Sequence, residues 1–596
     1  MSEHKDRLNA LRAELKSRKL DGFVLPLTDE HMSEYVGAYA GRLDYITGFT
    51  GSAGNGVVLL DKAAVFIDGR YTIQAAAELD PALFEHHLFT KLPLLKWTTD
   101  NLPKGARLGY DPELTTVGWE DAARKACARK GVELVAVDSN PVDTVWADQP
   151  SEPMAPAVPH DSKYAGQDTR EKRAKVAAEL KEAGADAAVI TMLDSVAWAF
   201  NIRGKDVMNT PVTHAFAVMN ADETATLFIN EKKVTSELKQ HLGNSVQVEP
   251  RDAFYDTLAK LGTNGKSVLV DPATNNAKVF KTLRDAGAKL IEGADPCILP
   301  KAVKNETEQQ GARDCHIRDG AAVSEFLHWI SVEAPKGTVD EMKAVQKLWQ
   351  CRESHGGLKD KSFDTISGAG PNGAIVHYRV SEKTNRPLKV DEIYLVDSGG
   401  QYLDGTTDIT RTVIVGTPTA EMKDRFTRVL KGHIALSTMR FPEGTPGMAL
   451  DAIARRPLWA IGCDYDHGTG HGVGSFLAVH EGPQRIAKYS SDIWLQPGMI
   501  LSNEPGYYKE GSYGIRIENL ILVKKVEENT EREIYEFENL TWVPIDRNLV
   551  EASLLDDVEL KWLNDYHAKV FELVSPHVDE ATRNWLQVQT APIMVM

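Results

Sequence analysis

The chain has 596 residues, which is too long for one hydrophobic core and predicts roughly three to five folding units. Its residues are 42% hydrophobic and 26% charged, as in an ordinary globular protein. The 85 acidic residues outnumber the 68 lysines and arginines, and the net charge of −17 argues against nucleic acid or an anionic membrane surface as the main partner.

The start of the chain favours a cytoplasmic protein. Residues 1–23 are charged throughout and lack the uninterrupted apolar segment of a signal peptide. Leu8, Leu11 and Leu15 recur at helical spacing and predict an amphipathic helix. The five cysteines are scattered without a CxxC pair, which is typical of a reducing compartment. The chain has no apolar run of ~18 residues, so we expect no membrane span.

The first half of the chain predicts two copies of one helix-and-sheet unit. The segments LRAELKSRKLDGFVLP and KVAAELKEAGADAAVIT resemble each other, and each is followed by a polar turn, an aromatic-bearing element and a strand pair. Between the copies, DQPSEPMAPAVPH contains four prolines and is typical of a linker. We therefore expect an α/β domain in residues 1–153 and a second in residues 154–302.

From residue 303 onward the pattern changes. ADPCILPKAVKN marks the second boundary, and a long helix is expected to begin directly after it. Two helical segments then precede a strand-rich stretch, and a polar, aromatic and partly helical extension ends the chain. We expect residues 303–596 to form the third domain, within an α/β (α+β) fold overall.

Two carboxylates lie on a predicted hairpin in EIYLVDSGGQYLDGTTDITRTVIVG. Asp397 ends the first strand, and Asp408 shares a face of the returning strand with Thr406 and Thr410. A charge in such an apolar setting is costly unless a cation or a partner meets it. Asp397 could instead cap the DSGG turn, whereas Asp408 lies within a β-branched run that fits a turn poorly.

A second pair of carboxylates lies in MILSNEPGYYKEGSYGIRIENLILV. Glu504 follows the apolar strand MILSN, and a Pro-Gly pair stops the strand behind it. In GIRIENLILV, the alternation places Arg516 and Glu518 on one strand face. Taken alone, Glu518 fits a solvated face, with or without Arg516 as a partner, better than it fits a ligand.

Three histidines lie between these segments, in HGTGHGVGSFLAVHEGP, and four glycines alternate with other residues over 468–474. The glycines let bulky ligands approach the backbone closely. The segment is not a dinucleotide-binding fingerprint, because the third glycine would fall on Val473, and it contains no HExxH motif. Four carboxylates with one histidine form a hard ligand set that suits two ions such as Mn²⁺, Mg²⁺, Co²⁺ or Fe²⁺.

The four carboxylates and the histidine, in their order along the chain, resemble the dinuclear site of the pita-bread metallopeptidases. This family includes methionine aminopeptidase, prolidase and Xaa-Pro aminopeptidase. HGTGHGVGSFLAVHEGP, YITGFTGSAG and FENLTWVPIDRNLV resemble the long, three-domain cytosolic Xaa-Pro aminopeptidases, and the likeness covers essentially the whole chain. The nine-residue gap from His471 to His480 exceeds that of the wider prolidase signature and is typical of the three-domain branch. The five residues of the set are Asp397, Asp408, His471, Glu504 and Glu518.

The resemblance implies two creatinase-like α/β domains, a pita-bread catalytic domain and two divalent metal ions, with Mn²⁺ favoured. It implies that Asp397 binds one metal ion and that His471 and Glu504 bind the other. Asp408 and Glu518 would then bridge the two ions. A homodimer is the expected assembly.

The resemblance also implies catalytic roles for residues outside this ligand shell. His377 in AIVHYRV, together with His467 and His480, matches the family's active-site histidines, which orient the substrate and stabilise the oxyanion. Glu504 would accept a proton and deliver it to the leaving nitrogen.

The expected activity is hydrolysis of the Xaa-Pro bond, which releases the N-terminal residue from short peptides with proline in second position. Such an amide lacks an N–H and restricts the preceding residue, so it needs a dedicated site. Two alternatives stay open. A prolidase would cleave only Xaa-Pro dipeptides, but the chain is long for one. A non-catalytic binding module would have lost ligands, but this chain keeps all five.

Overall fold

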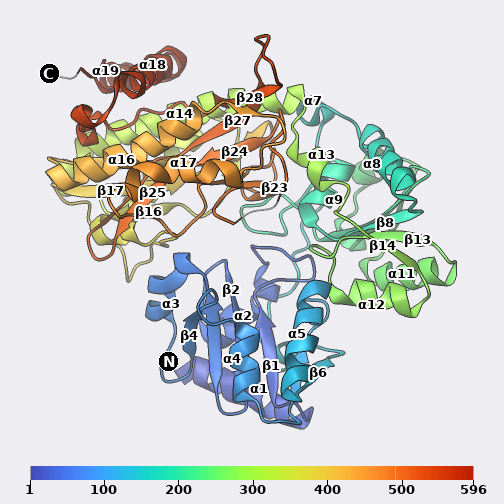
Figure 1. The fold of residues 1–596 in the computed structure, drawn as a ribbon. Helices are drawn as coiled ribbons and strands as arrows, with labels where there is room; N and C mark the ends of the chain where they lie inside the picture. Colours follow the sequence, from blue (N-terminus) through green and yellow to red (C-terminus); the bar gives the residue numbers. More distant parts are fainter. Residues whose placement is uncertain (1, 490–491, 595–596) are drawn as a thin grey trace. The chain divides into compact units, whose positions relative to one another are not determined.

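The computed structural model describes residues 2–489 and 492–594, and the chain forms two compact units (Figure 1). The first unit consists of Met1–Ser162 and Gln167–Ile298, and the second of Lys163–Gly166 and Leu299–Met596. Among the helices of the described residues, none combines the length and the apolar character needed to cross a membrane.

The first sheet of the first unit has the strand order β4-β3-β2-β1-β5-β6. Its strand β1 is antiparallel to β2 and parallel to β5, and the outer pairs β3–β4 and β5–β6 are parallel. Helix α1 buries Leu8, Leu11 and Leu15 against this sheet, which confirms the helix predicted from their spacing. The main elements are α1 (Ser2–Ser17), β1 (Gly22–Pro26), α2 (Arg42–Thr47), β2 (Gly54–Leu59), β3 (Ala63–Ile67), α3 (Thr72–Glu78), β4 (Glu85–Leu88), α4 (Leu94–Asn101), β5 (Arg107–Tyr110), α5 (Val117–Lys130), β6 (Glu133–Ala136) and α6 (Pro141–Val145).

The second sheet repeats this topology strand for strand, which confirms the predicted repeat. Its order is β12-β11-β10-β8-β13-β14, with β8 antiparallel to β10 and parallel to β13, and with parallel outer pairs. Asp168 begins helix α8 by accepting a hydrogen bond from the backbone N–H of Glu171, and Gly184 ends it at a φ of 69°. The main elements are α8 (Thr169–Ala183), β8 (Ala187–Ile190), α9 (Leu193–Phe200), β10 (Ala215–Asn220), β11 (Ala225–Ile229), α10 (Ser236–Leu242), β12 (Val246–Glu249), α11 (Phe254–Thr263), β13 (Ser267–Val270), α12 (Ala277–Asp285) and β14 (Lys289–Glu292).

Buried polar groups link the two halves of the first unit. Arg251 donates hydrogen bonds to Glu30 and lies 2.9 Å from Nε2 of His31. Nδ1 of His31 donates to the carbonyl oxygen of Thr191, at 2.8 Å. Burial, followed by the charge of Arg251, lowers the pKa of His31 to about 3. This imidazole is therefore neutral at physiological pH.

The second unit contains a six-stranded sheet of order β21-β28-β27-β24-β22-β23, a three-stranded sheet of order β16-β17-β20 and the hairpin β25–β26. A further short sheet has the order β15-β18-β19. The strands of these four sheets are β15 (Leu358–Lys361), β16 (Ile366–Ala369), β17 (Glu392–Ser398), β18 (Gly400–Tyr402), β19 (Gly405–Thr406), β20 (Ile409–Val415), β21 (Phe441–Pro442), β22 (Gly470–Gly472), β23 (Glu481–Ile486), β24 (Ile500–Asn503), β25 (Gly506–Lys509), β26 (Tyr513–Arg516), β27 (Asn519–Lys525) and β28 (Ile534–Asn539).

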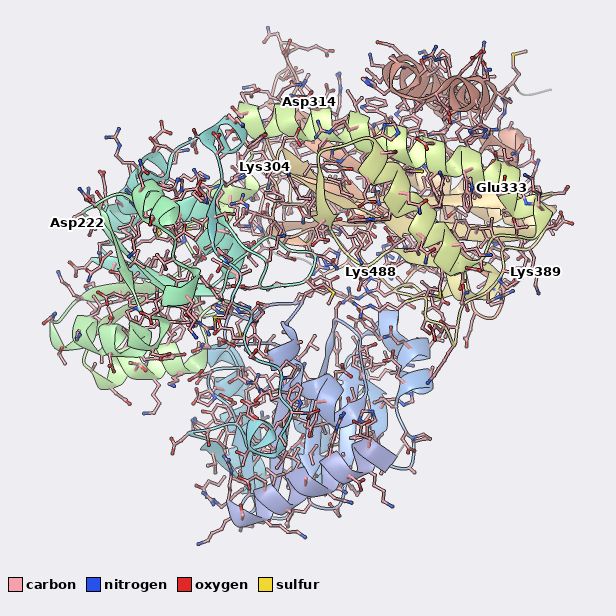
Figure 2. All side chains as sticks on the ribbon, turned by 180° about the vertical axis from the view of Figure 1, so that it is seen from behind. Asp222, Lys304, Asp314, Glu333, Lys389 and Lys488 are labelled. Atoms are coloured by element: carbon pink, nitrogen blue, oxygen red, sulfur yellow. The ribbon has the colours of Figure 1, made fainter. Side chains whose placement is uncertain are left out.

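Four long helices pack on these strands. Apolar residues of α14 and α15 share a buried cluster with Tyr394 and Val396 of β17, and those of α16 share one with Ile515 of β26. The predicted long helix begins at Glu306, where Asn305 and Glu308 form a reciprocal capping box. Figure 2 labels Asp314 near the start of α14 and Glu333 at its end. The helices are α14 (Glu306–Glu333), α15 (Glu341–Ser354), α16 (Ala420–Ser437) and α17 (Met448–Trp459).

Two predicted strands are interrupted, and both breaks fall at candidate ligands. Strand β19 ends at Thr406 and β20 begins at Ile409, so Asp408 lies between two strands, whereas we expected it within one. The run GIRIENLILV is not one strand either, because β26 pairs with β25 whereas β27 pairs with β24 and β28. Glu518 lies where the chain passes from one sheet to the other.

The C-terminal extension is helical, as predicted, and packs on the second unit. It contains α18 (Asp557–Val574) and α19 (Glu580–Gln589). Tyr566 stacks between Trp542 and Trp562, with ring centroids 5.7 and 5.3 Å away. This aromatic stack joins α18 to the strand-rich core.

Candidate metal centre

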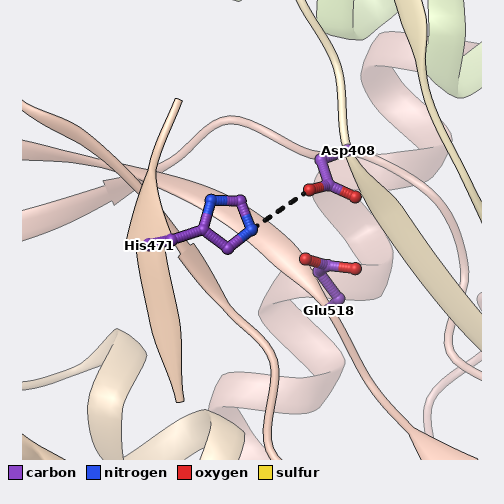
Figure 3. A group of neighbouring side chains, drawn as sticks. All are labelled: Asp408, His471 and Glu518. Carbon is purple, nitrogen blue, oxygen red and sulfur yellow. Dashed lines mark ion pairs between the residues drawn. The ribbon is translucent and has the colours of Figure 1, made fainter. Parts of the chain in front are cut away.

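Five separate parts of the second unit supply the predicted ligands. Figure 3 shows the side chains of Asp408, His471 and Glu518 pointing toward one another. One ligand atom of each lies within 4.8 Å of the others. The five positions are Asp397 in β17, Asp408 between β19 and β20, His471 in β22, Glu504 directly after β24 and Glu518 between β26 and β27.

His471 is oriented as a metal ligand. Its Nε2 lies 3.4 Å from Oδ2 of Asp408 and 3.5 Å from Oε1 of Glu504. Its Nδ1 lies 2.8 Å from the carbonyl oxygen of Gly472, which can only accept, so Nδ1 carries a proton. This hydrogen bond turns Nε2 toward the carboxylates, which is the usual arrangement of a histidine ligand.

The glycines around His471 allow three strands to approach closely. A Cβ atom on Gly470 would lie 2.0 Å from the carbonyl oxygen of Ser502, and one on Gly472 would lie 2.4 Å from that of Glu481. Strand β22 is therefore held between β23 and β24, which explains why the sequence alternates glycine with other residues here.

The carboxylates carry negative charge that the protein does not balance. Burial raises the pKa of Asp397, and although Arg516 opposes this, Asp408 and Glu504 add to it, so the pKa is about 7. Burial and the charges of Asp408 and Asp397 raise the pKa of Glu518 well above its usual range. Burial lowers the pKa of His471, but contacts with Asp408 and Glu504 outweigh it and raise the pKa to about 9.

This electrostatic pattern fits a cation. Oδ1 of Asp397 is buried and has no hydrogen-bond partner among the residues that the structure describes. Arg516 pairs with the other oxygen of Asp397, and Nη2 and Oδ2 are 2.6 Å apart. The remaining charge matches the hard, oxygen-rich ligand set that divalent ions such as Mn²⁺ prefer. The residues present therefore fit the metal ions that the sequence predicted.

A chain of hydrogen bonds that we did not predict extends from Asp397 to His467. Arg516 donates through Nη1 to the hydroxyl of Tyr508, at 2.7 Å, and that hydroxyl lies 2.8 Å from Nε2 of His467. Nδ1 of His467 donates to the carbonyl oxygen of Gly468, so in the neutral imidazole Nε2 accepts from the hydroxyl of Tyr508. The sequence signal for Arg516 was a lone cation inside an apolar run, but we had considered it only as a partner of Glu518, in the alternative that places Glu518 on a solvated face.

Two hydroxyls in the site were also missed. Ser502 accepts from the backbone N–H of His471, at 2.9 Å, and donates to Oε1 of Glu504, at 3.0 Å. Thr410 donates to Oε2 of Glu518, at 2.7 Å. Serine and threonine on buried strands are common, so nothing in the sequence distinguished these two.

The structure places the other predicted histidines as follows. The ring of His480 lies edge-on to that of His471, with centroids 4.4 Å apart. Nδ1 of His467 lies 3.9 Å from Oε2 of Glu504. His377 is half-buried in a turn that follows the 3₁₀ helix Gly370–Ala374. That helix packs on β26, because a Cβ atom on Gly514 would lie 1.7 Å from the carbonyl oxygen of Gly373.

Comparison with known proteins identifies the family. The model of metallopeptidase family M24 matches residues 310–525, a range that contains all five predicted ligands. Two models of the Creatinase/Prolidase N-terminal domain match residues 7–145 and 148–308, and the C-terminal region of peptidase_M24 matches residues 533–593. The chain belongs to metallopeptidase family M24.

Two similar proteins that align over nearly the whole chain have names of Xaa-Pro aminopeptidases. The probable Xaa-Pro aminopeptidase P of Talaromyces marneffei is 42% identical over 99% of this chain and 92% of that protein. The crystal structure of X-prolyl aminopeptidase from Caenorhabditis elegans, described as a cytosolic enzyme with a di-nuclear active site, matches with a TM-score of 0.95 and 33% identity over 100% of both chains. The prolidase from Pyrococcus horikoshii matches with a TM-score of 0.50 and 25% identity, over 63% of this chain and 99% of that one.

These matches confirm the predicted fold. The first unit contains two creatinase-like domains, and the second contains a pita-bread catalytic domain. The domain boundaries after residues 153 and 302 stay predictions.

Proposed function

We infer that this protein is an Xaa-Pro aminopeptidase, a metal-dependent hydrolase that releases the N-terminal residue from peptides with proline in second position. The observation that carries this inference is the cluster that half-buried His471 forms with the buried carboxylates of Asp408 and Glu518. It lies in a chain that aligns over nearly its whole length with aminopeptidase P relatives.

The resemblance to the family supplies the proposed ligand roles. Asp397 would hold one ion, His471 and Glu504 would hold the other, and Asp408 and Glu518 would be shared by the pair. The contact of His471 with both Asp408 and Glu504 supports this division. When bound, the two divalent ions would polarise the scissile carbonyl and supply a hydroxide nucleophile near neutral pH.

The side chains around the ions handle protons and position the substrate. Glu504, oriented by Ser502, accepts the proton of the nucleophile and delivers it to the proline nitrogen as the amide breaks. His377, His467 and His480 orient the carbonyl and stabilise the oxyanion. Tyr508 limits the freedom of the His467 ring, because it occupies Nε2.

The identity of the native metal ion, the oligomeric state and the cellular compartment are also proposals. We propose Mn²⁺ as the native ion, since the ligand set is dominated by carboxylates. A homodimer in the cytoplasm is supported by the resemblance to three-domain enzymes and by the cytosolic nematode relative. Metal analysis of protein purified without added ions, light scattering and cell fractionation test these three proposals.

A cleavage assay tests the function. The purified protein is stripped of metal and assayed on an Xaa-Pro-Xaa tripeptide with and without Mn²⁺. We expect activity only with metal, and none in Asp408→Ala or Glu518→Ala. Glu510→Ala, an exposed carboxylate between β25 and β26, is the matched control and should keep full activity. Full activity of Asp408→Ala would overturn the metal assignment.

The two rival functions are separated by simple measurements. A prolidase would cleave an Xaa-Pro dipeptide but not the matching pentapeptide, whereas we expect the pentapeptide to be cleaved. The prolidase match leaves more than a third of this chain uncovered, which favours the aminopeptidase. A non-catalytic module would bind no divalent metal.

A further inference from the structure

Glu341 is a buried carboxylate to which no role has been given. It is the first residue of α15 and is 0% exposed. Its carboxylate accepts hydrogen bonds from the backbone N–H groups of Ala369, at 2.8 Å, and Arg386, at 3.0 Å. It also accepts from Nδ2 of Asn372, at 2.9 Å, and from the hydroxyl of Tyr378, at 2.8 Å. All four of these partners are neutral donors.

These donors surround His377 along the chain. Asn372 and Tyr378 lie on either side of it, and Ala369 and Arg386 lie at the two ends of the same segment. The carbonyl oxygen of Thr384 accepts a further hydrogen bond from Asn372, at 3.0 Å, and lies 3.1 Å from the hydroxyl oxygen of Tyr378. We call residues 369–386 the His377 loop. One carboxylate therefore fixes this loop at four points.

The other side of the His377 loop is held by backbone contacts. A Cβ atom on Gly368 would lie 2.7 Å from Cα of Gly373, and one on Gly514 would lie 1.7 Å from the carbonyl oxygen of Gly373. The start of the loop is thus confined between β16 and β26. Because β26 ends at Arg516, the partner of Asp397, the loop is fixed relative to the metal centre.

The hydrogen bonds that Glu341 accepts are better suited to orienting the His377 loop than to stabilising the fold. Burying a carboxylate costs free energy that hydrogen bonds largely offset, so the net stabilisation is small. Hydrogen bonds to a charged acceptor are nevertheless short and directional. A group of this kind fixes where its donors lie.

We propose that Glu341 is a positioning residue for His377. By holding the His377 loop at four points, it keeps the imidazole directed at the substrate carbonyl during hydrolysis. The proposal rests on the proposed function, in which His377 acts on the substrate.

The test compares Glu341→Gln in the wild-type and in the His377→Ala background, using steady-state cleavage of an Xaa-Pro-Xaa peptide by the Mn²⁺-loaded protein. The amide brings an N–H group where only an acceptor fits, so the loop must shift. A misplacement of about 1 Å lowers a rate by roughly 10- to 100-fold, and we expect a loss of that size in kcat with KM nearly unchanged. In the His377→Ala background, Glu341→Gln should change kcat by less than about 2-fold, because the group it positions is gone.

Controls separate positioning from loss of structure. Metal content and the unfolding midpoint are measured for each variant, and Glu353→Gln, an exposed carboxylate on the same helix, should behave as the wild type. Tyr378→Phe removes a single donor and should give a smaller loss with the same dependence on His377. If Glu341→Gln does not fold, Tyr378→Phe replaces it in the comparison between the wild-type and the His377→Ala backgrounds.

The outcomes distinguish this inference from the proposed function. Wild-type activity of His377→Ala would overturn the role given to His377 in catalysis, and the positioning role with it. If His377→Ala is impaired and Glu341→Gln lowers kcat equally in both backgrounds, the positioning role alone is wrong. A wild-type kcat for both Glu341→Gln and Tyr378→Phe would also overturn it.

Discussion

Proton binding and metal binding compete at the ligand residues. Without metal, burial and neighbouring charges raise the pKa of Asp397 to about 7 and that of Glu518 further above its usual range. A cation must displace these protons, so metal binding should release protons at pH 6.5 and the affinity should fall as the pH drops below 7. Calorimetric titration of the stripped protein with Mn²⁺, in two buffers of different ionisation enthalpy, measures the release. Equal heats in both buffers would contradict the charge distribution described above.

A buried ion cluster contains Glu481, the residue that follows His480 in the sequence. Oε2 of Glu481 is 2.8 Å from Nζ of Lys301, and its Oε1 accepts from Nζ of Lys304. All three side chains are at most 1% exposed. Glu481→Gln would remove the carboxylate that two buried ammonium groups share.

We therefore expect Glu481→Gln to lower the unfolding free energy of the second unit by about 3 kcal/mol or more. Lys304→Met should cost less, because Glu481 keeps Lys301. Denaturant unfolding, followed by the fluorescence of the second unit, measures both. Lys525→Met, which removes one partner of an exposed pair, is the control and should change the midpoint little. A smaller effect of Glu481→Gln than of Lys304→Met would contradict this account.

At the level of elements, the spacing between β22 and β24 determines where His471 lies. Gly470→Ala would place a Cβ atom 2.0 Å from a backbone oxygen of β24, which must move the strands apart. We expect this variant to lose most of its metal affinity and activity, as measured by metal analysis after dialysis. Gly118→Ala, in helix α5 with open space around it, should leave metal content unchanged. Normal metal content in Gly470→Ala would show that the strand spacing is not critical.

The sequence predicted the elements better than it predicted their ends. Helices α1 and α14 were correctly predicted because apolar spacing and capping residues are local signals. The breaks at Asp408 and Glu518 were missed, since the choice of partner strand depends on distant parts of the chain. For the same reason the only partner considered for Arg516 was nearby Glu518, whereas Arg516 binds Asp397, which precedes it by more than a hundred residues.

Across the whole molecule, buried neutral histidines predict acid sensitivity. Burial and nearby arginines lower the pKa of His31 in the first unit, and of His433 and His567 in the second, to about 3, from an ordinary value of 6.5. Between these values the unfolded chain binds more protons than the folded one, so stability present above pH 6.5 is lost as the pH falls toward 3.

Thermal unfolding at constant ionic strength should therefore show falling midpoints for both units between pH 6.5 and 4. His433→Gln and His567→Gln test the assignment in the second unit, and each should flatten the pH dependence there, leaving the first unit unchanged. A midpoint that does not vary over this range would contradict the buried neutral state of these imidazoles.

The predicted ligands are widely spaced along the chain, which constrains when the metal centre can form during synthesis. Asp397 leaves the ribosome long before Glu518, and each ligand belongs to a different strand or strand junction. The full set cannot assemble until the chain has emerged beyond β27 and the long-range strand pairs have formed. Metal ions would accordingly enter a catalytic domain that is already folded, and their supply would limit activation more than it limits folding.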